Sequence, residues 1–515
     1  MDCIRFKNIK VRSVNENMSA LLDLPKKVTE FLSDTRKMFI NGEWVPSISG
    51  KVYESINPAN GKVFAKIYEG DKEDVDRAVR AARAAFKGPW SKTSPAERSR
   101  LLHKLADLIE EHAEEFAYLE TLDFGSPIHF SRHGFVQGAI AHFRYYAGWA
   151  TKLTGETMSM TTGGNFHVYT KREPIGVCGQ ITSWNFPLLG ASWKLAAPLA
   201  AGNTVVLKPS QQTSLTTLLL GELIQQAGFP DGVVNIVTGP GGTIGEAIAT
   251  HPDIDKIGFT GSTEVGKSIM RHSANNLKKL TLELGGKSPN IIFADADLDK
   301  AIQGAIMGMF SNTGQVCVAG SRLYVEKKIY NQVVEQLVTM ARNIKVGDPL
   351  DPSTHMGPLV SKVQLEKVKN YIEIAKKDGA KVLTGGKSPS EPALADGYYL
   401  EPTILTGIDE NCTSVREEIF GPVLVVLPFE DIDEVIERAN LTDYGLAAGV
   451  WTKDLSKAHK MINALEAGNI WVNGYLLNND NIPYGGFKQS GVGKEHGYAG
   501  IEAYTKVKSV VISLD

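Results

Sequence analysis

The feature that most constrains the fold is an alternation of short apolar segments with helix-length segments, which begins at Ile175. The apolar segments predict strands over Ile175–Ile181, Thr204–Leu207, Val233–Thr238, Ile257–Thr260 and Leu280–Leu284. The segments between them predict helices over Pro187–Ala201, Leu215–Ala227 and Thr243–Thr250. This alternation indicates right-handed βαβ units around a parallel sheet. Such a fold places ligand-binding loops at the carboxyl ends of the strands.

A second α/β region is predicted from near Gly286 to about Asn473. Its expected strands are Asn290–Phe293, Arg322–Val325, Lys381–Thr384, Val423–Pro428 and Ala448–Trp451, and Gly385–Gly397 is expected to be a surface loop. A last strand, Val507–Leu514, lies almost at the C-terminus. Because a strand with an open edge needs a partner, it must pair either within the chain or with another subunit.

The N-terminal part is expected to contribute a hairpin and two helices. Residues 1–37 are interpreted as an irregular or helical lead-in, and Met38–Val45 as a hairpin that turns at Asn-Gly. One helix is expected from Asp71 to Gly88-Pro89, and a second from Ser94 through Leu119. The lead-in lacks the apolar region of a secretory signal, and an organelle transit function is a minority interpretation. We therefore expect a cytoplasmic protein.

Composition narrows the function classes. A chain of 515 residues exceeds the usual size of one hydrophobic core, so two or three domains are expected. The net charge of −3 argues against the strongly basic surface that nucleic-acid binding needs. The absence of a long apolar run argues against a membrane span. The four cysteines are far apart, with no spacing suited to zinc, so we expect no metal site. Such sparse cysteines suit a reducing compartment.

Two segments contain residues that suit nucleophilic catalysis. Cys317 lies between glycines in Gly314–Gly320, where it is either a buried structural thiol or a nucleophile. Glu283 lies between leucines at the end of a predicted strand, before two glycines. Such a carboxylate is either a paired core acid or a general base whose pKa burial raises toward neutrality.

A third segment, Ser183-Trp184-Asn185-Phe186-Pro187, lies at a predicted junction between strand and helix. The amide of Asn185 can donate a hydrogen bond to a developing oxyanion. The alternative is an ordinary helix N-cap, and Pro187 at the first helical turn fits that alternative well. Spacing alone favours the cap.

Together with Phe259–Gly266 and Glu417–Pro422, these three segments identify a family. The five segments occur in the same order as in the aldehyde dehydrogenase superfamily, and the chain resembles that superfamily over Phe39–Val511. The separation of 34 residues between Glu283 and Cys317 (317 − 283) is also similar to that of the family. The resemblance implies an α/β fold with a Rossmann-like nucleotide-binding domain, an α/β catalytic domain and a small β oligomerisation element. The corresponding ranges are 1–37 (lead-in), 38–285 (mainly NAD(P)-binding, with oligomerisation strands near 150–172), 286–485 (catalytic) and 486–515 (C-terminal segment with an oligomerisation strand).

The resemblance also implies the catalytic roles. Cys317 would be the nucleophile, Glu283 the base that activates water, and Asn185 would form the oxyanion hole with the backbone N–H of Cys317. Lys194 matches a family lysine near the catalytic residues, and Glu495 matches a second carboxylate that assists proton transfer. The implied reaction is oxidation of an aldehyde to its carboxylic acid through a cysteine thioester, with hydride accepted by NAD or possibly NADP.

For the cofactor, the resemblance implies a pocket without the usual GxGxxG loop, with Gly261–Gly266 as the family's own glycine motif at a helix start. Lys208 would contact the adenosine ribose, Glu418 would hold the nicotinamide ribose, and Phe420 would lie beside the ring. The other residues expected in the cofactor pocket are Ile181, Thr182, Ser183, Trp184, Ser210, Gln211, Gly241, Gly245, Phe259, Thr260, Gly261, Ser262, Val265, Leu284 and Gly285.

Two departures from the family pattern bear on function. Neutral Gln211 stands where NAD-preferring members usually carry an acidic residue, which would repel a 2′-phosphate, so the sequence leaves NADP use open. Ser183 replaces a common proline before the Trp-Asn pair. We expect this replacement to loosen the approach to Asn185 slightly.

For the substrate, the resemblance implies a tunnel that involves Gly190, Trp193, Val316, Val318 and the segment Tyr475–Ile482. Relatives that recognise a quaternary ammonium group often supply a Trp at two positions of this tunnel. Here those positions are occupied by Ser311 and by Leu476–Asn479, so a medium aliphatic or aromatic aldehyde is favoured. Two alternatives are a CoA-acylating semialdehyde dehydrogenase, disfavoured by Glu283, and a catalytically silent binding protein. A homo-oligomer, dimer or tetramer, is expected because Phe166–Thr170 and Val507–Leu514 resemble the family's subunit-joining strands.

Overall fold

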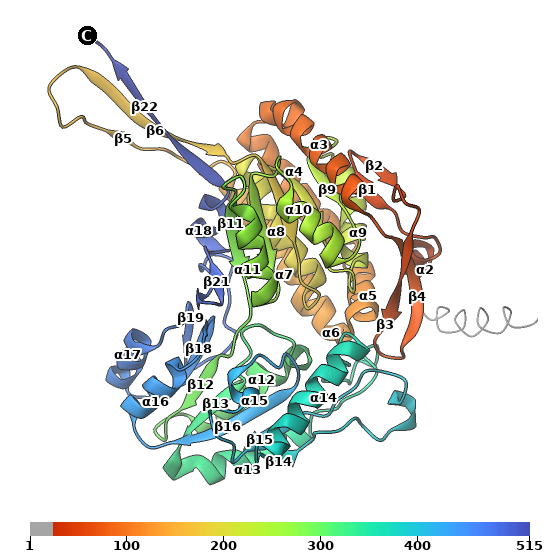
Figure 1. Cartoon of the computed structure of the whole chain (residues 1–515), viewed down its shortest axis with the longest axis vertical. Coiled ribbons are helices and arrows are strands. Elements are labelled where there is room, and N and C mark those ends of the chain that lie inside the picture. The colour runs from red at the N-terminus through yellow and green to blue at the C-terminus, as the bar shows by residue number, and fades with distance from the viewer. Residues whose placement is uncertain (1–23) are drawn as a thin grey trace, which may run out of the picture.

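The computed structural model describes residues 24–515, so residues 1–23 of the predicted lead-in lie outside the described part. Two large sheets organise the chain, one in the upper and one in the lower half of Figure 1, and a slender arm projects from the upper half. Among the described residues, no helix is long and apolar enough to cross a membrane.

The first sheet has a parallel centre with the strand order β9-β8-β7-β10-β11. This is the order of a Rossmann fold, in which chain connections diverge to either side of the first strand. The crevice of such a fold lies at the carboxyl ends of β7 and β10. The strands are β7 (Val177–Ile181), β8 (Thr204–Lys208), β9 (Val234–Ile236), β10 (Lys256–Thr260) and β11 (Lys279–Glu283).

Short antiparallel strands extend this sheet at both edges. The predicted hairpin is present as β1 (Met38–Ile40) and β2 (Glu43–Val45), and β1 pairs with β9. At the other edge, β21 (Gly491–Val492) from the C-terminal segment pairs with β11. A separate hairpin that the sequence analysis missed consists of β3 (Val52–Asn57) and β4 (Lys62–Tyr68).

Helices cover both faces of the first sheet, which gives it an apolar core on each side. One face carries α3 (Lys72–Lys87), α10 (Glu246–Thr250) and α11 (Thr263–Ser273). The other face and its outer layer carry α4 (Pro95–Glu111), α5 (Ala113–Phe124), α7 (Gln137–Trp149), α8 (Pro187–Ala201) and α9 (Leu215–Ala227). Two short helices, α2 (Lys26–Leu32) and α6 (Ile128–Phe130), lie beside this layer.

Two predicted helix bounds were wrong. The segment from Ser94 to Leu119 forms two helices, because α4 ends at Glu111 and α5 begins at Ala113. His112, at φ −105° and ψ 20°, breaks the helical path between them. The expected helix Thr243–Thr250 is a wide turn over Gly241–Gly245 followed by α10, since three glycines in that turn favour a looser conformation.

The second sheet has the order β14-β15-β16-β13-β12-β18-β19, and all neighbours except β14 and β15 are parallel. Its strands are β12 (Pro289–Ile292), β13 (Arg322–Glu326), β14 (Lys381–Thr384), β15 (Thr403–Thr406), β16 (Val423–Phe429), β18 (Ala447–Trp451) and β19 (Asn469–Val472). The strands β15 and β19 were missed in the sequence analysis. The predicted mixed α/β fold is confirmed by the two sheets.

Helices also cover the second sheet on both faces, over two further apolar cores. They are α12 (Leu298–Phe310), α13 (Tyr330–Arg342), α14 (Lys362–Lys377), α15 (Thr413–Arg416), α16 (Ile432–Asn440) and α17 (Leu455–Ala464).

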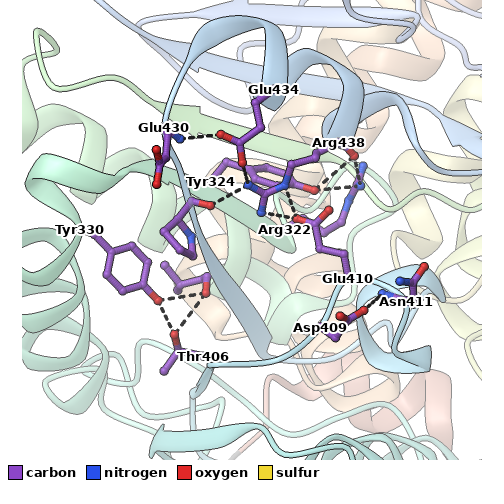
Figure 2. A network of polar contacts seen from close by, with 12 residues as sticks. Arg322, Tyr324, Tyr330, Thr406, Asp409, Glu410, Asn411, Glu430, Glu434 and Arg438 are labelled. Atoms are coloured by element: carbon purple, nitrogen blue, oxygen red, sulfur yellow. Dashed lines mark hydrogen bonds and ion pairs between the residues drawn. The ribbon is translucent and has the colours of Figure 1, made fainter.

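Figure 2 shows how polar contacts fix α16. Arg438 donates to Glu410 and Glu434, while Arg322 of β13 donates to the Ala439 carbonyl at 2.8 Å.

The arm is a three-stranded antiparallel sheet of β5 (Thr157–Met158), β6 (Phe166–Pro174) and β22 (Thr505–Ser513). The C-terminus lies at its tip (Figure 1). The terminal strand therefore has a partner within the chain. Short pairs β17 (Tyr444–Gly445) with β20 (Phe487–Lys488), and the helix α18 (Gly497–Glu502), connect the second sheet back to this arm.

Candidate active site

A cavity of about 460 Å³ joins the loops at the carboxyl ends of β7, β10 and β11 to segments of the second sheet. Its volume lies in the range of small-molecule sites. Cys317, Glu283 and Asn185, which the sequence assigns to catalysis, all line this cavity. The structure therefore brings together three residues from three separate segments.

Cys317 follows a tight turn after α12. Asn312, Thr313 and Gly314 have positive φ values of 55°, 57° and 69°. These left-handed residues reverse the chain at the end of α12 and direct the thiol into the cavity. Burial raises the pKa of the Cys317 thiol to about 12, and a 3.3 Å contact with the Tyr484 hydroxyl offsets this only in part. The resting thiol is therefore protonated and needs a base.

Glu283 ends β11 and is only 3% exposed. Neither carboxylate oxygen has a hydrogen-bond partner among the described residues. Burial raises the pKa of Glu283 well above its usual value, and the nearby Glu495 raises it further against the opposing effect of Lys194 and Lys494. A side chain at Gly485 would approach Glu283 Oε1 to 2.7 Å, so glycine is required there. Once ionised, this carboxylate is therefore a stronger base than an exposed glutamate.

Asn185 does not cap a helix, so the interpretation that spacing alone favoured is wrong. The N-cap of α8 is Phe186, with no side-chain cap, and Asn185 instead donates from Nδ2 to the Gln315 carbonyl at 2.9 Å. The backbone N–H of Cys317 makes no hydrogen bond to the described residues. The amide of Asn185 has a second N–H, so both groups can serve an oxyanion.

Ser183 acts in the opposite way to our expectation. Its hydroxyl donates to Asn185 Oδ1 at 2.7 Å, and Asn312 Nδ2 donates to the Asn185 carbonyl at 2.9 Å. These contacts fix the amide orientation with Nδ2 toward the cysteine segment. The serine therefore holds the Asn185 side chain instead of loosening the approach to it.

Lys194 and Glu495 form a buried ion pair behind the cavity, with side-chain exposures of 1% and 5%. Neither lines the cavity, but Glu495 raises the pKa of Glu283 and Lys194 lowers it. They thus act on the base electrostatically. Tyr484, whose hydroxyl contacts the Cys317 sulfur, was missed by the sequence analysis. The only sequence signal for a role of Tyr484 was its position as an aromatic residue between a proline and a glycine, in Pro483-Tyr484-Gly485.

A second part of the cavity contains the residues expected to hold a nicotinamide ribose. Glu418 accepts a hydrogen bond from the Gly286 backbone at 2.9 Å, and a side chain at Gly285 would come within 2.6 Å of its carboxylate. The Phe420 ring stands edge-on to Trp184 with centroids 5.2 Å apart. The cavity is lined here by Ser183, Trp184, Thr260, Gly261, Ser262, Leu284, Gly285, Glu418 and Phe420.

The other predicted cofactor residues lie outside this cavity, on the rim of the first sheet. Lys208 is the last residue of β8, and its side chain lies 3.9 Å from where a Cβ at Gly245 would stand. Burial lowers the pKa of the Lys208 ammonium group to about 8. Outside the turn that carries it, no atom of the described residues lies within 4 Å of where a Cβ at Gly241 would stand. The ring of Phe259 packs beneath Gly261 in the core, so it supports the glycine motif from below. The rest are Ile181, Thr182, Ser210, Gln211 and Val265.

The third part of the cavity is an apolar channel. Gly190, Trp193, Val316 and Val318 line it, as the sequence predicts. A Cβ at Gly190 would make only an ordinary 3.8 Å contact with Thr182, so glycine leaves real space there. Residues that the sequence analysis missed complete the channel: Phe130, Phe135, Phe186, Leu189, Met307 and Tyr484.

Tyr475 was wrongly expected in the tunnel. Its side chain is buried against Gly308, Gly320 and Gly449, and its hydroxyl donates to the Val318 carbonyl at 2.9 Å. It supports the cysteine segment from behind. Three small residues leave a slot of the size of an aromatic ring, which draws Tyr475 into the core, and Leu476 takes the place at the channel.

Comparison with known proteins identifies the family. The sequence profile described as "Aldehyde dehydrogenase family" matches residues 44–510. The chain belongs to the aldehyde dehydrogenase family. It is 49% identical to aldehyde dehydrogenase 1A1 of Gallus gallus over 494 residues (95% of this chain and 96% of that protein). It is also 49% identical to the mitochondrial aldehyde dehydrogenase of Homo sapiens over 481 residues (93% and 92%).

Solved structures agree. The aldehyde dehydrogenase of Bacillus cereus, solved as an NAD⁺ complex, superposes with a TM-score of 0.93 at 52% identity and covers 96% of this chain and 99% of its own. The predicted family, enzyme class and fold class are thereby confirmed. The chain is an aldehyde dehydrogenase, and oxidation of aldehydes to acids is the activity that this assignment carries.

Proposed function

We propose that this aldehyde dehydrogenase uses Cys317 as nucleophile, Glu283 as general base and Asn185 as oxyanion donor, with NAD⁺ as the oxidant. The observation that carries the proposal is the convergence of these three side chains on one cavity. The alternatives of a silent binding protein and of an acyl transfer to coenzyme A are not favoured. A silent protein has no need for an unpaired buried carboxylate, and acyl transfer has no need for a water-activating base.

The first half of the reaction forms a carbon–sulfur bond. Glu283 takes the proton of the Cys317 thiol, and the thiolate adds to the aldehyde carbon. The resulting oxyanion receives hydrogen bonds from the Asn185 amide and the backbone N–H of Cys317. When the C=O bond re-forms, hydride leaves that carbon, and bound NAD⁺ supplies the acceptor that no side chain can provide. The product on Cys317 is a thioester.

The second half hydrolyses this thioester. Glu283 first releases the thiol proton to solvent and then removes a proton from water, hydroxide adds to the acyl carbon, and the same two N–H donors hold the charge. Collapse breaks the carbon–sulfur bond and releases the carboxylic acid, and the leaving thiolate takes the proton back from Glu283. Burial has the largest effect on the pKa of Glu283, and the ion pair adjusts it in opposite directions, because Glu495 raises it and Lys194 lowers it.

The residues around the second part of the cavity, which contains Glu418 and Phe420, fit NAD⁺. Glu418 would hold the nicotinamide ribose, Phe420 would lie against the ring, and the start of α11 after Gly261-Ser262 would face the pyrophosphate. Lys208 would reach the adenosine ribose. Gln211 carries no charge against a 2′-phosphate, so we propose that NADP⁺ is accepted as well.

The apolar channel favours a medium aliphatic or aromatic aldehyde. Phe135 and Phe186 meet edge-to-face at 5.2 Å in its wall, and Trp193 and Met307 add apolar surface. The test is a panel of aliphatic, aromatic and quaternary ammonium aldehydes with NAD⁺ and NADP⁺ in parallel, with and without coenzyme A. We expect acid release without coenzyme A. Strict dependence on coenzyme A would overturn the proposed hydrolytic step.

We further propose that the arm joins subunits in a homo-oligomer. Its strands expose apolar side chains, among them Val507 (56% exposed), Val511 (54%) and Met158 (43%). An isolated sheet of this kind needs cover. Light scattering that finds only the 56.0 kDa chain at micromolar concentration would contradict this. We place the protein in the cytoplasm, because the three described cysteines are free; cell fractionation tests this.

A further inference from the structure

We propose that His142, Asp480 and His496 form a binding site for a divalent transition-metal ion, with Zn²⁺ as the preferred ion. One ligand atom from each of the three residues lies within 4.8 Å of the other two. The set has two imidazoles and one carboxylate, a donor combination typical of zinc sites that keep water as a further ligand. The residues come from α7, from the loop after β19 and from the start of α18.

The two histidines are buried and have nitrogens without partners. His142 is 1% exposed and His496 is 4% exposed. His142 Nδ1 lies 2.7 Å from Asp480 Oδ1, but its Nε2 has no hydrogen-bond partner among the described residues. Neither ring nitrogen of His496 has one. Buried polar atoms are normally satisfied, so three bare imidazole nitrogens beside one carboxylate call for a ligand.

The charge states also suit a metal. Neutral imidazole, the form that binds metal ions, offers one nitrogen lone pair to a cation. Asp480, whose side chain is 22% exposed, brings one negative charge and gives the site an opening to solvent. A cation with two neutral ligands and one anionic ligand fits this set.

The backbone holds the three ligands in place. The Gly497 N–H donates to the Asp480 carbonyl at 2.7 Å, and Tyr146, one turn after His142 on α7, donates to the Gly497 carbonyl at 3.1 Å. His496 has φ 61° and ψ 166°, a conformation that favours glycine. This backbone turns its side chain toward α7. Zinc–nitrogen bonds of about 2.0–2.1 Å place tetrahedral ligands about 3.3 Å apart, so small rotations of the rings would close the set.

The site adjoins the catalytic cavity without sharing a ligand with it. The His496 ring stands edge-on to Trp193 with centroids 4.2 Å apart, and it lies 5.6 Å from the ring of Tyr484. Both of these rings line the channel, and Tyr484 also contacts the Cys317 sulfur. An ion bound here would therefore fix one wall of the aldehyde channel from behind.

The experiment measures Zn²⁺ binding by calorimetry to the chelator-treated full-length protein. It is done in the Cys317→Ala background, so that the active-site thiol cannot bind the probe, and it needs no turnover. We expect one ion per chain and an increase in Tm on binding. His142→Gln, His496→Gln and Asp480→Asn should each weaken binding at least about tenfold. Co²⁺ in place of Zn²⁺ should show visible absorption that the same substitutions remove.

His251→Gln is the matched control. His251 Nε2 also faces an aspartate, Asp76 Oδ1 at 3.4 Å, but residues 24–515 offer this pair no third ligand, so its loss should leave binding unchanged. Asp480→Asn is the mildest of the three test variants and guards against a histidine variant that does not fold. If the parent binds no stoichiometric Zn²⁺, or binds it equally well after Asp480→Asn, the proposed site is wrong.

Discussion

The two ends of the catalytic cavity are built in different ways. At the chemical end, Cys317, Glu283 and Asn185 each lie in a short segment that a strand end or a tight turn fixes. At the channel end, the wall includes side chains from distant segments that are held mainly by apolar packing, such as Phe186 and Leu476. We therefore expect the chemical end to tolerate almost no substitution, whereas substitutions in the channel should change the substrate without changing the reaction.

The largest expected effect comes from removing the nucleophile. Without the Cys317 sulfur no covalent adduct can form, so Cys317→Ala should lower kcat by at least about 10³-fold, as seen generally when covalent catalysis is lost. Stopped-flow measurement of NADH formation checks this. Cys412→Ala is the matched control, because Cys412 precedes α15 away from the cavity. Equal activity of the Cys317 variant and the parent would remove Cys317 from the mechanism.

The base at the same end has the next largest effect. Glu283→Gln keeps the size of the side chain but cannot accept a proton, so steady-state turnover should fall by about 10²–10⁴-fold. Because only the ionised carboxylate is a base, and burial raises its pKa, the parent's rate should fall as the pH drops through that raised pKa. The variant should lose this acidic limb. A variant with an unchanged pH–rate profile would show that another group is the base.

Loss of the oxyanion donor should cost somewhat less. Asn185→Ala removes one of two N–H donors, and the backbone N–H of Cys317 remains, so we expect a decrease of about 10²–10³-fold in kcat. Ser183→Ala is an informative partner, since it removes only the 2.7 Å hydrogen bond that orients the amide. It should cost much less than Asn185→Ala. The reverse order would mean that Asn185 has only a structural role.

The contrast between the two ends also explains what the sequence could predict. Glu283 and Cys317 lie in glycine-flanked segments, so local patterns marked both as candidates, and the family resemblance implied their roles. Tyr475 could not be placed this way, because the slot between Gly308, Gly320 and Gly449 exists only after α12, β18 and the loop that carries Cys317 have packed. The same holds for His142, Asp480 and His496, because Asp480 follows His142 by 338 residues (480 − 142) and His496 follows Asp480 by 16 (496 − 480). Spacing rules for zinc detect only ligands that are close in sequence.

The predicted strands show the same limit. Apolar runs such as Thr204–Leu207 were found nearly to the residue because a central parallel strand is buried on both faces. The missed strand β19 (Asn469–Val472) also contains an apolar run, Ile470-Trp471-Val472, but it lies at the edge of its sheet and is only partly buried. Its position depends on pairing with β18, which is a contact between segments and not a local pattern.

A charge at the cofactor rim should have a moderate effect that separates cofactor choice from chemistry. Gln211→Glu places a carboxylate near the expected adenosine ribose, where it would repel a 2′-phosphate. We expect kcat/KM with NADP⁺ to fall about tenfold relative to NAD⁺. Gln212→Glu adds the same charge at the next residue, which is exposed, and serves as control. Equal effects of both variants would exclude a specific contact of residue 211.

The smallest effect is expected at the channel wall, where neighbouring leucines allow a sharp comparison. Leu476 lines the cavity, whereas Leu477 is 62% exposed and does not. Leu476→Ala removes apolar contact with the bound aldehyde but leaves Cys317, Glu283 and Asn185 in place. KM for an apolar aldehyde should therefore rise roughly three- to tenfold while kcat changes less than about twofold, and Leu477→Ala should change neither. If Leu476→Ala lowered kcat as strongly as KM rose, the wall would help to position the reacting atoms, and the separation between the two ends of the cavity would not hold.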